Sequence, residues 1–156
     1  MITIVGTLAA LCTAVIFGID VLAAIVMRPV YAEVDDRMLV QITGRAHRYG
    51  DLRLSVPGIG SVVAGAATVL VAFLTGSTTA GVLAASGLAA LIVWLVLFTR
   101  ISVPINRTLI TASLAGDTPS NARALQDRWE SIINVRAVLQ GLALVAFCLA
   151  IGVGAR

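Results

Sequence analysis

The sequence predicts an all-α membrane protein: a bundle of four transmembrane helices with two long amphipathic connections on one side. Of the 156 residues, 59% are hydrophobic and only 12% are charged, too few polar side chains to cover a water-soluble or disordered chain. Four apolar runs approach or exceed the ~20 residues that a helix needs to cross a bilayer. These runs lack the alternating period of barrel strands. We therefore expect residues 1–156 to form a single transmembrane domain.

The four expected helices differ in their flanking residues and in their composition. The first begins uncharged and is longer than the ~7–15 apolar residues of a signal peptide, so we expect it to be retained. The second and third contain small-xxx-small pairs, such as Ser61–Gly65 and Gly81–Ala85, which allow close packing within one bundle or in a homodimer. The fourth begins with polar residues. The expected bounds are 3–27, 56–75, 79–101 and 132–153.

All arginines except Arg156 at the C-terminus lie at or between two pairs of these helices. The chain has no lysine, and five arginines lie at or between helices 1 and 2 and five more at or between helices 3 and 4, whereas the short link 76–81 has none. The positive-inside rule places both long connections in the cytoplasm and both termini outside, in a bacterial-type plasma membrane. The net charge of +3 reflects these helix flanks, so we expect membrane lipids as partners and no nucleic acid.

Both long connections are expected to contain helices. In the first, Asp35 and Asp36 suit the first turn of a helix. In the second, the third helix continues as an amphipathic extension, residues 116–119 form a turn, and Ser120 or Asn121 caps a new helix. An apolar stripe at helical spacing marks the first connection: Met38, Leu39, Ile42, Ala46 and Tyr49.

Asp20 is the most unusual polar residue. It lies eight residues before Arg28, which places it roughly 12 Å inside the first helix. A carboxylate at that depth costs about 2.5–3.5 kcal/mol on insertion scales, so it must be paired, protonated or turned to the bundle interior. It is either a pocket-lining acid or base, or a structural hydrogen-bonding group between helices.

Other polar residues gather at the arginine-rich ends of the helices. His47, the only histidine, is either a general base or an ordinary surface group. Trp129 is either an interfacial anchor or part of a pocket. The short amides of Asn106 and Asn134 must bond to a helix, a ligand or water, and Arg136 either snorkels or joins them. We expect a pocket built from Asp20, Asn106, Asn134 and Arg136.

Two stretches carry a family resemblance. Residues 102–106 (SVPIN), followed by Trp129 and then 134–136 (NVR), are similar to the pattern of the anthrone oxygenase-like family of small four-helix membrane proteins. The resemblance implies a pocket that includes Asn106, Trp129, Asn134 and Arg136, and oxidation of anthrones without a conventional redox cofactor. Two stretches depart from the family pattern: Ser102 replaces its first asparagine, and the helix entry that often reads N-H-V-R is Ile133-Asn134-Val135-Arg136 here, with no histidine.

These observations lead to a functional hypothesis with alternatives. We expect a cofactor-poor membrane oxidoreductase, or oxygenase, for a hydrophobic aromatic or quinone-like substrate, with Asp20, His47 and Arg136 as catalytic residues. Asn106, Trp129 and Asn134 are then the substrate-binding residues. The lone histidine provides no metal or haem ligand set, and no cofactor is expected. The alternatives are a non-enzymatic protein that binds a lipid or quinone or serves as an assembly subunit, and a small proton-coupled carrier that depends on Asp20.

Overall fold

The computed structural model describes residues 1–155, which are almost entirely helical and contain no strand. This confirms the expected all-α bundle, and the described chain has four helices long and apolar enough to cross a membrane. Each expected span lies within one of these helices to within a residue. The helical segments are α1 Ile2–Leu22, η1 Ala23–Met27, α2 Arg28–Glu33, α3 Asp36–Arg53, α4 Ser55–Leu74, α5 Thr78–Leu97, η2 Phe98–Ser102, α6 Val103–Ala115, α7 Ala122–Glu130 and α8 Ile133–Gly154.

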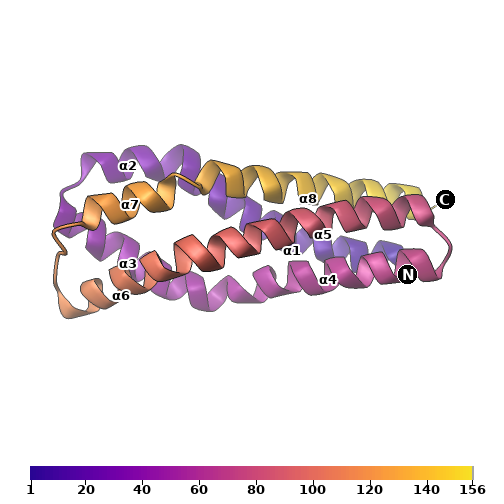
Figure 1. The fold of residues 1–156 in the computed structure, drawn as a ribbon, viewed down its shortest axis with the longest axis horizontal. Coiled ribbons are helices and arrows are strands. Elements are labelled where there is room, and N and C mark those ends of the chain that lie inside the picture. The colour runs from indigo at the N-terminus through magenta and orange to yellow at the C-terminus, as the bar shows by residue number, and fades with distance from the viewer. Residues whose placement is uncertain (156) are drawn as a thin grey trace.

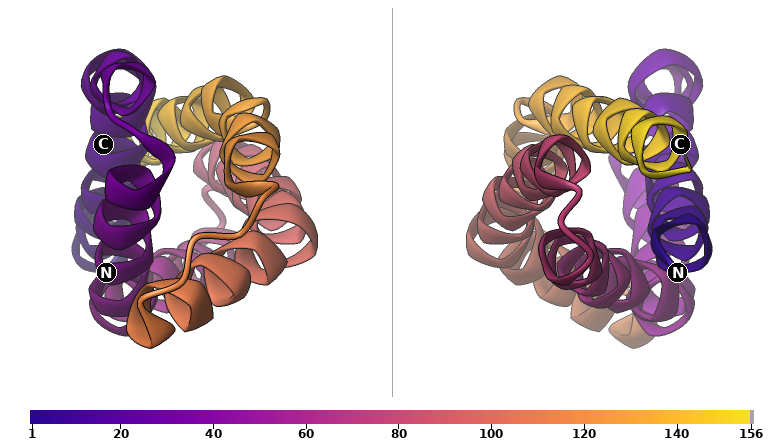
Figure 2. Two further views of the ribbon diagram at one scale, coloured as in Figure 1. Left: turned by 90° about the vertical axis from the view of Figure 1, so that its left-hand side faces the viewer. Right: turned by 90° about the vertical axis from the view of Figure 1, so that its right-hand side faces the viewer.

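The four long helices form a square bundle, seen end-on in Figure 2. Helices α1 and α5 each pack against both α4 and α8, so α1 and α5 lie on one diagonal. Small residues permit this packing. A Cβ atom on Gly65 would come within 2.8 Å of Phe147, and one on Gly87 within 3.2 Å of the Ala143 carbonyl oxygen. The close approach predicted from the small-residue pairs is therefore present within the chain.

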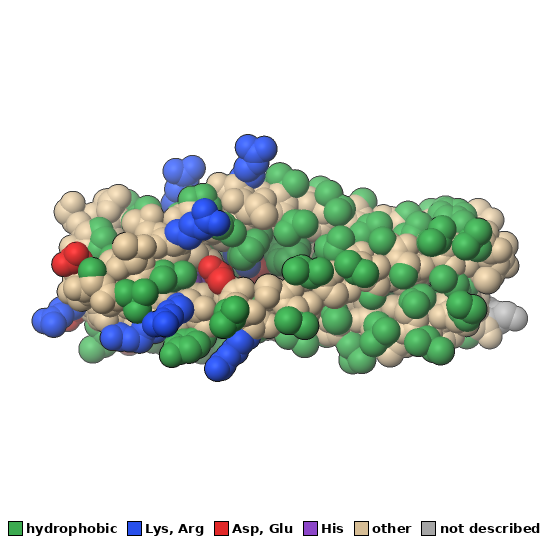
Figure 3. Space-filling view, turned by 90° about the horizontal axis from the view of Figure 1, so that it is seen from below, with side chains coloured by type: hydrophobic (Ala, Val, Ile, Leu, Met, Phe, Trp, Pro, Cys, Tyr) green, Lys and Arg blue, Asp and Glu red, His purple; other side chains and the backbone are tan. Residues whose placement is uncertain are grey.

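The outer surface divides into two zones along the bundle (Figure 3). Hydrophobic side chains cover the half that contains the α4–α5 turn, whereas arginine side chains gather over the other half. Large apolar residues such as Leu11, Ile59, Val63 and Leu142 are more than half exposed, as suits a surface that faces lipid. We call the arginine-bearing half, with α2, α3, α6 and α7, the arginine-rich end.

Two of the long helices pass through a π-helical turn just before a proline. Segment η1 ends two residues before Pro29, and η2 ends two residues before Pro104. Proline lacks an N–H and its ring clashes with the carbonyl four residues earlier, and a wider turn accommodates both effects. The helices therefore continue beyond the bounds expected from the apolar runs, as far as Glu33 and Ala115.

At the arginine-rich end, α3 packs on α6, and Figure 1 shows these two helices on one side with α2 and α7 on the other. Asp35 caps α3, because its Oδ1 accepts from the Met38 N–H at 2.7 Å. The contact with α6 centres on Gly44, where any Cβ would collide with the backbone of Leu109 and the side chain of Ser113.

The apolar stripe expected on α3 does not form its buried face. Met38, Ile42, Ala46 and Tyr49 are exposed, and only Leu39 of that set is buried. The buried face is instead Leu39, Val40, Thr43 and Gly44. Thr43 and Gly44 face the protein here because the backbones of α3 and α6 approach too closely for larger side chains.

Candidate functional site

A buried ion pair joins α1 to α8 at the border of the arginine-rich end. Arg136 Nη2 donates to Asp20 Oδ1 at 2.7 Å, and Gln140 Nε2 donates to Asp20 Oδ2 at 3.0 Å. Asp20 is 3% exposed and Arg136 5% exposed. Because both carboxylate oxygens are satisfied, the pair resolves the cost of the acid in the first helix. In this structure Asp20 and Arg136 thus form a paired, hydrogen-bonded unit.

Arg136 also contacts the helix formed by α5, η2 and α6. Its Nη1 donates to Ser102 Oγ at 2.8 Å. Its guanidinium carbon lies 5.3 Å from the ring centres of both Phe98 and Trp129, so aromatic groups from two further elements flank the charge. These are cation–π distances, so both aromatic rings can contribute to holding the guanidinium.

His47 approaches this cluster from α3. Its ring centre lies 5.4 Å from that of Trp129, at an interplanar angle of 46°. Burial, and secondarily the positive charge of Arg136, lower the pKa of His47 from 6.5 to about 4. The imidazole is therefore neutral at pH 7, and its unprotonated nitrogen can accept a hydrogen bond.

Asn106 extends the cluster toward the surface and introduces a second acid. Its Nδ2 donates to Asp51 Oδ1 at 2.9 Å, and Asn106 itself is buried. Burial raises the pKa of Asp51, while the hydrogen bond from Asn106 and the charges of Arg136 and Arg107 act in the opposite direction. Asp51 lies one helical turn after His47, so the two groups share a face of α3.

Several buried polar atoms in this cluster lack a protein partner within residues 1–155. Buried polar groups are usually satisfied by protein or by ordered water, so a concentration of free ones marks a place for water or for polar atoms of a ligand. Both donors and acceptors are represented. The atoms are His47 Nε2, Asn106 Oδ1, Trp129 Nε1, Arg136 Nε and Gln140 Oε1.

The structure brings together most of the residues singled out from the sequence. One expectation is not met: Asn134 is exposed and lies away from the cluster. Residues two apart in a helix point about 200° from each other, so Asn134 and Arg136 cannot share a pocket wall. Trp129 is buried between Arg136 and His47. The assembled residues are Asp20, His47, Asn106, Trp129 and Arg136.

Sequence reasoning missed three contributors to the cluster. Ser102 was noted only as a departure from a motif. Gln140 had a usable signal, because it is an amide inside an apolar run, four residues after Arg136 and thus on the same face. The signal for Asp51 was weaker: it lies four residues after the only histidine, and thus on the same helical face.

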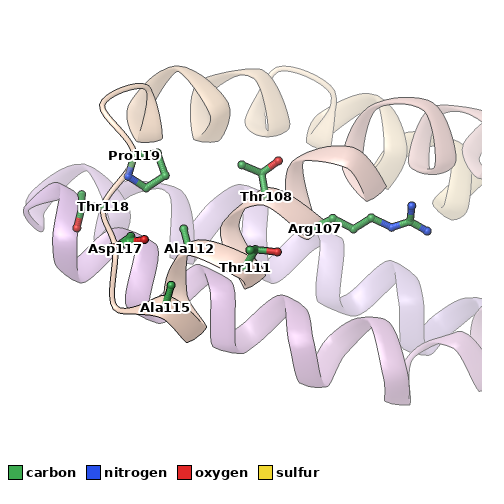
Figure 4. A pocket seen from close by; sticks show the side chains of 8 residues that line it. All are labelled: Arg107, Thr108, Thr111, Ala112, Ala115, Asp117, Thr118 and Pro119. Atoms are coloured by element: carbon green, nitrogen blue, oxygen red, sulfur yellow. The ribbon is translucent and has the colours of Figure 1, made fainter.

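Two grooves of the surface lie outside this cluster. One, of about 680 Å³, lies along α6 beside the turn to α7 and is shown in Figure 4. It is lined by Arg107, Thr111, Asp117 and Pro119 among others. A second, of about 710 Å³, lies between α2 and α7. In the described part of the chain, no group of three or more His, Cys, Asp or Glu side chains is arranged to hold a metal ion.

Comparison of the chain with protein-family models, with curated proteins and with solved structures found no match.

Proposed function

We propose that this chain is a membrane-embedded oxygenase for hydrophobic, weakly acidic aromatic compounds of the anthrone or hydroquinone type. The observation that carries the proposal is the buried guanidinium of Arg136, held between two aromatic rings and near a neutral histidine. The resemblance of residues 102–106 and 129–136 to the anthrone oxygenase-like pattern supports the same chemistry. In this proposal the arginine-rich end faces the cytoplasm.

The proposed reaction needs a base and a stabiliser of negative charge. His47 accepts a proton from the acidic C–H or O–H of the substrate, since both oxygens of Asp20 are already engaged. Arg136 and Asn106 stabilise the resulting enolate or phenolate as preorganised polar groups. The electron-rich carbon then reacts with dioxygen. For an anthrone, the ring CH₂ becomes C=O, one O₂ is consumed and one H₂O is released.

A second candidate function is binding without turnover, to a lipid or quinone or as a subunit of an assembly. The Asp20–Arg136–Gln140 network favours it, because both carboxylate oxygens of Asp20 are already satisfied by Arg136 and Gln140. In that case the free atoms of His47, Asn106 and Trp129 hold a ligand and no bond is broken.

Oxygen consumption separates the two functions. The detergent-purified protein is mixed with an anthrone or one of several hydroquinones, and O₂ uptake and quinone absorbance are followed against heat-denatured protein. The proposal expects turnover that His47→Gln and Arg136→Gln abolish, and that the exposed control Asn134→Ala retains. Ligand retention in mass spectra without O₂ uptake for every compound would establish binding instead and refute the oxygenase.

A further inference from the structure

The groove between α2 and α7 is a polar site separate from the cluster around Arg136. It has a volume of about 710 Å³ and is lined by side chains of Arg28, Tyr31, Arg123, Gln126, Asp127 and Glu130. We propose that this groove binds the headgroup of a phospholipid that carries a primary ammonium group. The proposal does not depend on the oxygenase activity.

The groove stays open because α2 and α7 are joined through a side chain and not through their backbones. Arg123 Nη1 donates to the Tyr31 carbonyl oxygen at 2.6 Å, and Nη2 donates to that of Val34. Arg123 Nε pairs with Asp36 Oδ1 at 2.7 Å. Helix α2 has no buried residue. On the other side of this end, by contrast, Gly44 lets α3 close tightly onto α6.

The groove holds a free acceptor in its wall. Gln126 is 3% exposed, its Nε2 donates to Glu130 Oε1 at 2.9 Å, and its Oε1 has no partner within the described residues. A buried amide oxygen in a groove of this size requires a donor from water or from a ligand. The exposed carboxylate of Asp127 lies one residue further along α7 and adds a negative charge.

The groove also holds a positive charge at its other side. Arg28 Nε pairs with Glu130 Oε2 at 3.1 Å, and the Arg28 side chain is 50% exposed, so part of the guanidinium faces the groove. Arg123 is already engaged by two carbonyls and a carboxylate. The groove therefore presents one partly free cation, one free buried acceptor and one exposed anion, a pattern that complements a zwitterion.

The position of the groove indicates a lipid as the source of that zwitterion. It lies at the arginine-rich end, where α2 and α7 extend the long apolar helices α1 and α8 and where headgroups are expected (Figure 1). The apolar residue Val30, between the lining residues Pro29 and Tyr31 in the sequence of α2, is exposed and available to an acyl chain. The phosphate is expected at Arg28, and the ammonium, with three N–H donors, at Gln126 Oε1 and Asp127.

Headgroup chemistry provides the test. The purified protein is offered lipids with identical acyl chains and an ethanolamine, choline or glycerol headgroup, and bound lipid is measured by native mass spectrometry. We expect at least tenfold preference for ethanolamine, because a trimethylammonium group has no N–H donor and a phosphoglycerol has no cation. Gln126→Leu and Asp127→Asn should each lower ethanolamine-lipid binding at least threefold.

The groove along α6 supplies a matched control. The groove of Figure 4 has a similar volume, and its lining also includes an arginine and an aspartate. Arg107→Ala alters that groove and should leave lipid binding unchanged. Equal binding of ethanolamine and choline lipids, a preference for phosphoglycerol, or no effect of Asp127→Asn would each overturn the proposal. Because Asp127 is exposed, Asp127→Asn should not disturb folding. The Asp127→Asn variant therefore keeps the test decisive even where Gln126→Leu fails to fold.

Discussion

Arg136 and Asp20 are 116 residues apart in the sequence and form one buried contact, with 2.7 Å between Nη2 and Oδ1. The pair joins the first and last long helices of the bundle. Ser102 accepts a further hydrogen bond from Arg136, and Gln140 donates one to Asp20. The network thereby connects α1, η2 and α8 at one level. Its neighbours His47 and Trp129 bring α3 and α7 to the same place.

Removing one member of this pair should be more harmful than removing both. Arg136→Met or Asp20→Leu leaves a buried charge without its partner and should lower the free energy of unfolding by about 3–5 kcal/mol. The double variant should be closer to the wild type than either single variant. Unfolding in detergent with a denaturant measures this, and strictly additive losses would show that the two side chains do not depend on each other.

Gly44 should be intolerant of even a methyl group. In Gly44→Ala the new Cβ collides with the Leu109 backbone and forces α3 away from α6, with an expected loss of about 1–3 kcal/mol. Gly50→Ala on the same helix is the matched control, because its Cβ would lie 3.7 Å from Leu54 Cδ1, an ordinary contact. Gly50→Ala should be neutral or slightly stabilising. Equal melting temperatures for the two variants would contradict the close packing.

The neutral state of His47 should make the protein sensitive to acid. Its pKa is about 4 in the folded protein and near 6.5 when unfolded, so the unfolded chain takes up the proton first as the pH falls below 6.5. Stability should therefore drop from pH 7 to pH 5, on the order of 1–2 kcal/mol at pH 5. Melting temperatures across this range measure the loss.

The nearby Asp51 acts in the opposite direction, because a raised pKa in the folded state favours folding as the carboxyl becomes protonated. The pH series is therefore best measured in an Asp51→Asn background. Adding His47→Gln to that background should flatten the dependence between pH 5 and pH 7. An unchanged slope after this substitution would assign the titration to another group.

Arg123 should control the order of the α2–α3 connection. Arg123→Ala removes the bonds to the Tyr31 and Val34 carbonyls and the ion pair with Asp36. Because α2 has no buried residue, backbone hydrogen exchange over residues 30–36 should rise several-fold. Arg128→Ala, at an exposed position of the same helix, should leave exchange there unchanged. Protection that survives Arg123→Ala would show that α2 is held by other contacts.

The sequence predicted those features that depend on one segment at a time. Apolar length defined the membrane-spanning helices, and the cost of a buried carboxylate indicated that Asp20 needs a partner. The identity of that partner depends on how α1 and α8 rotate toward each other, which no single segment determines. The same applies to α3, whose buried face was set by the Gly44 contact and not by its own apolar stripe.

The outward position of Asn134 shows where motif reasoning reached its limit. Its neighbours in the NVR stretch suggested a shared pocket, yet helical geometry separates alternate residues to opposite faces. Gln140, which the motif does not include, occupies the place expected for the asparagine and bonds Asp20. Spacing within a known helix is thus a better guide to this site than adjacency in the sequence.

The π-helical turn η2 acts as a phase correction in the longest helix. Trp94, Phe98, Ser102 and Asn106 are four residues apart and all face the protein interior. In a regular α-helix each such step drifts by about 40°, and three steps would carry the row about 120° around the axis. The wider turn takes up part of that drift. Deleting one residue from 99–101 would therefore divide the row into two misaligned halves without changing any of its four side chains.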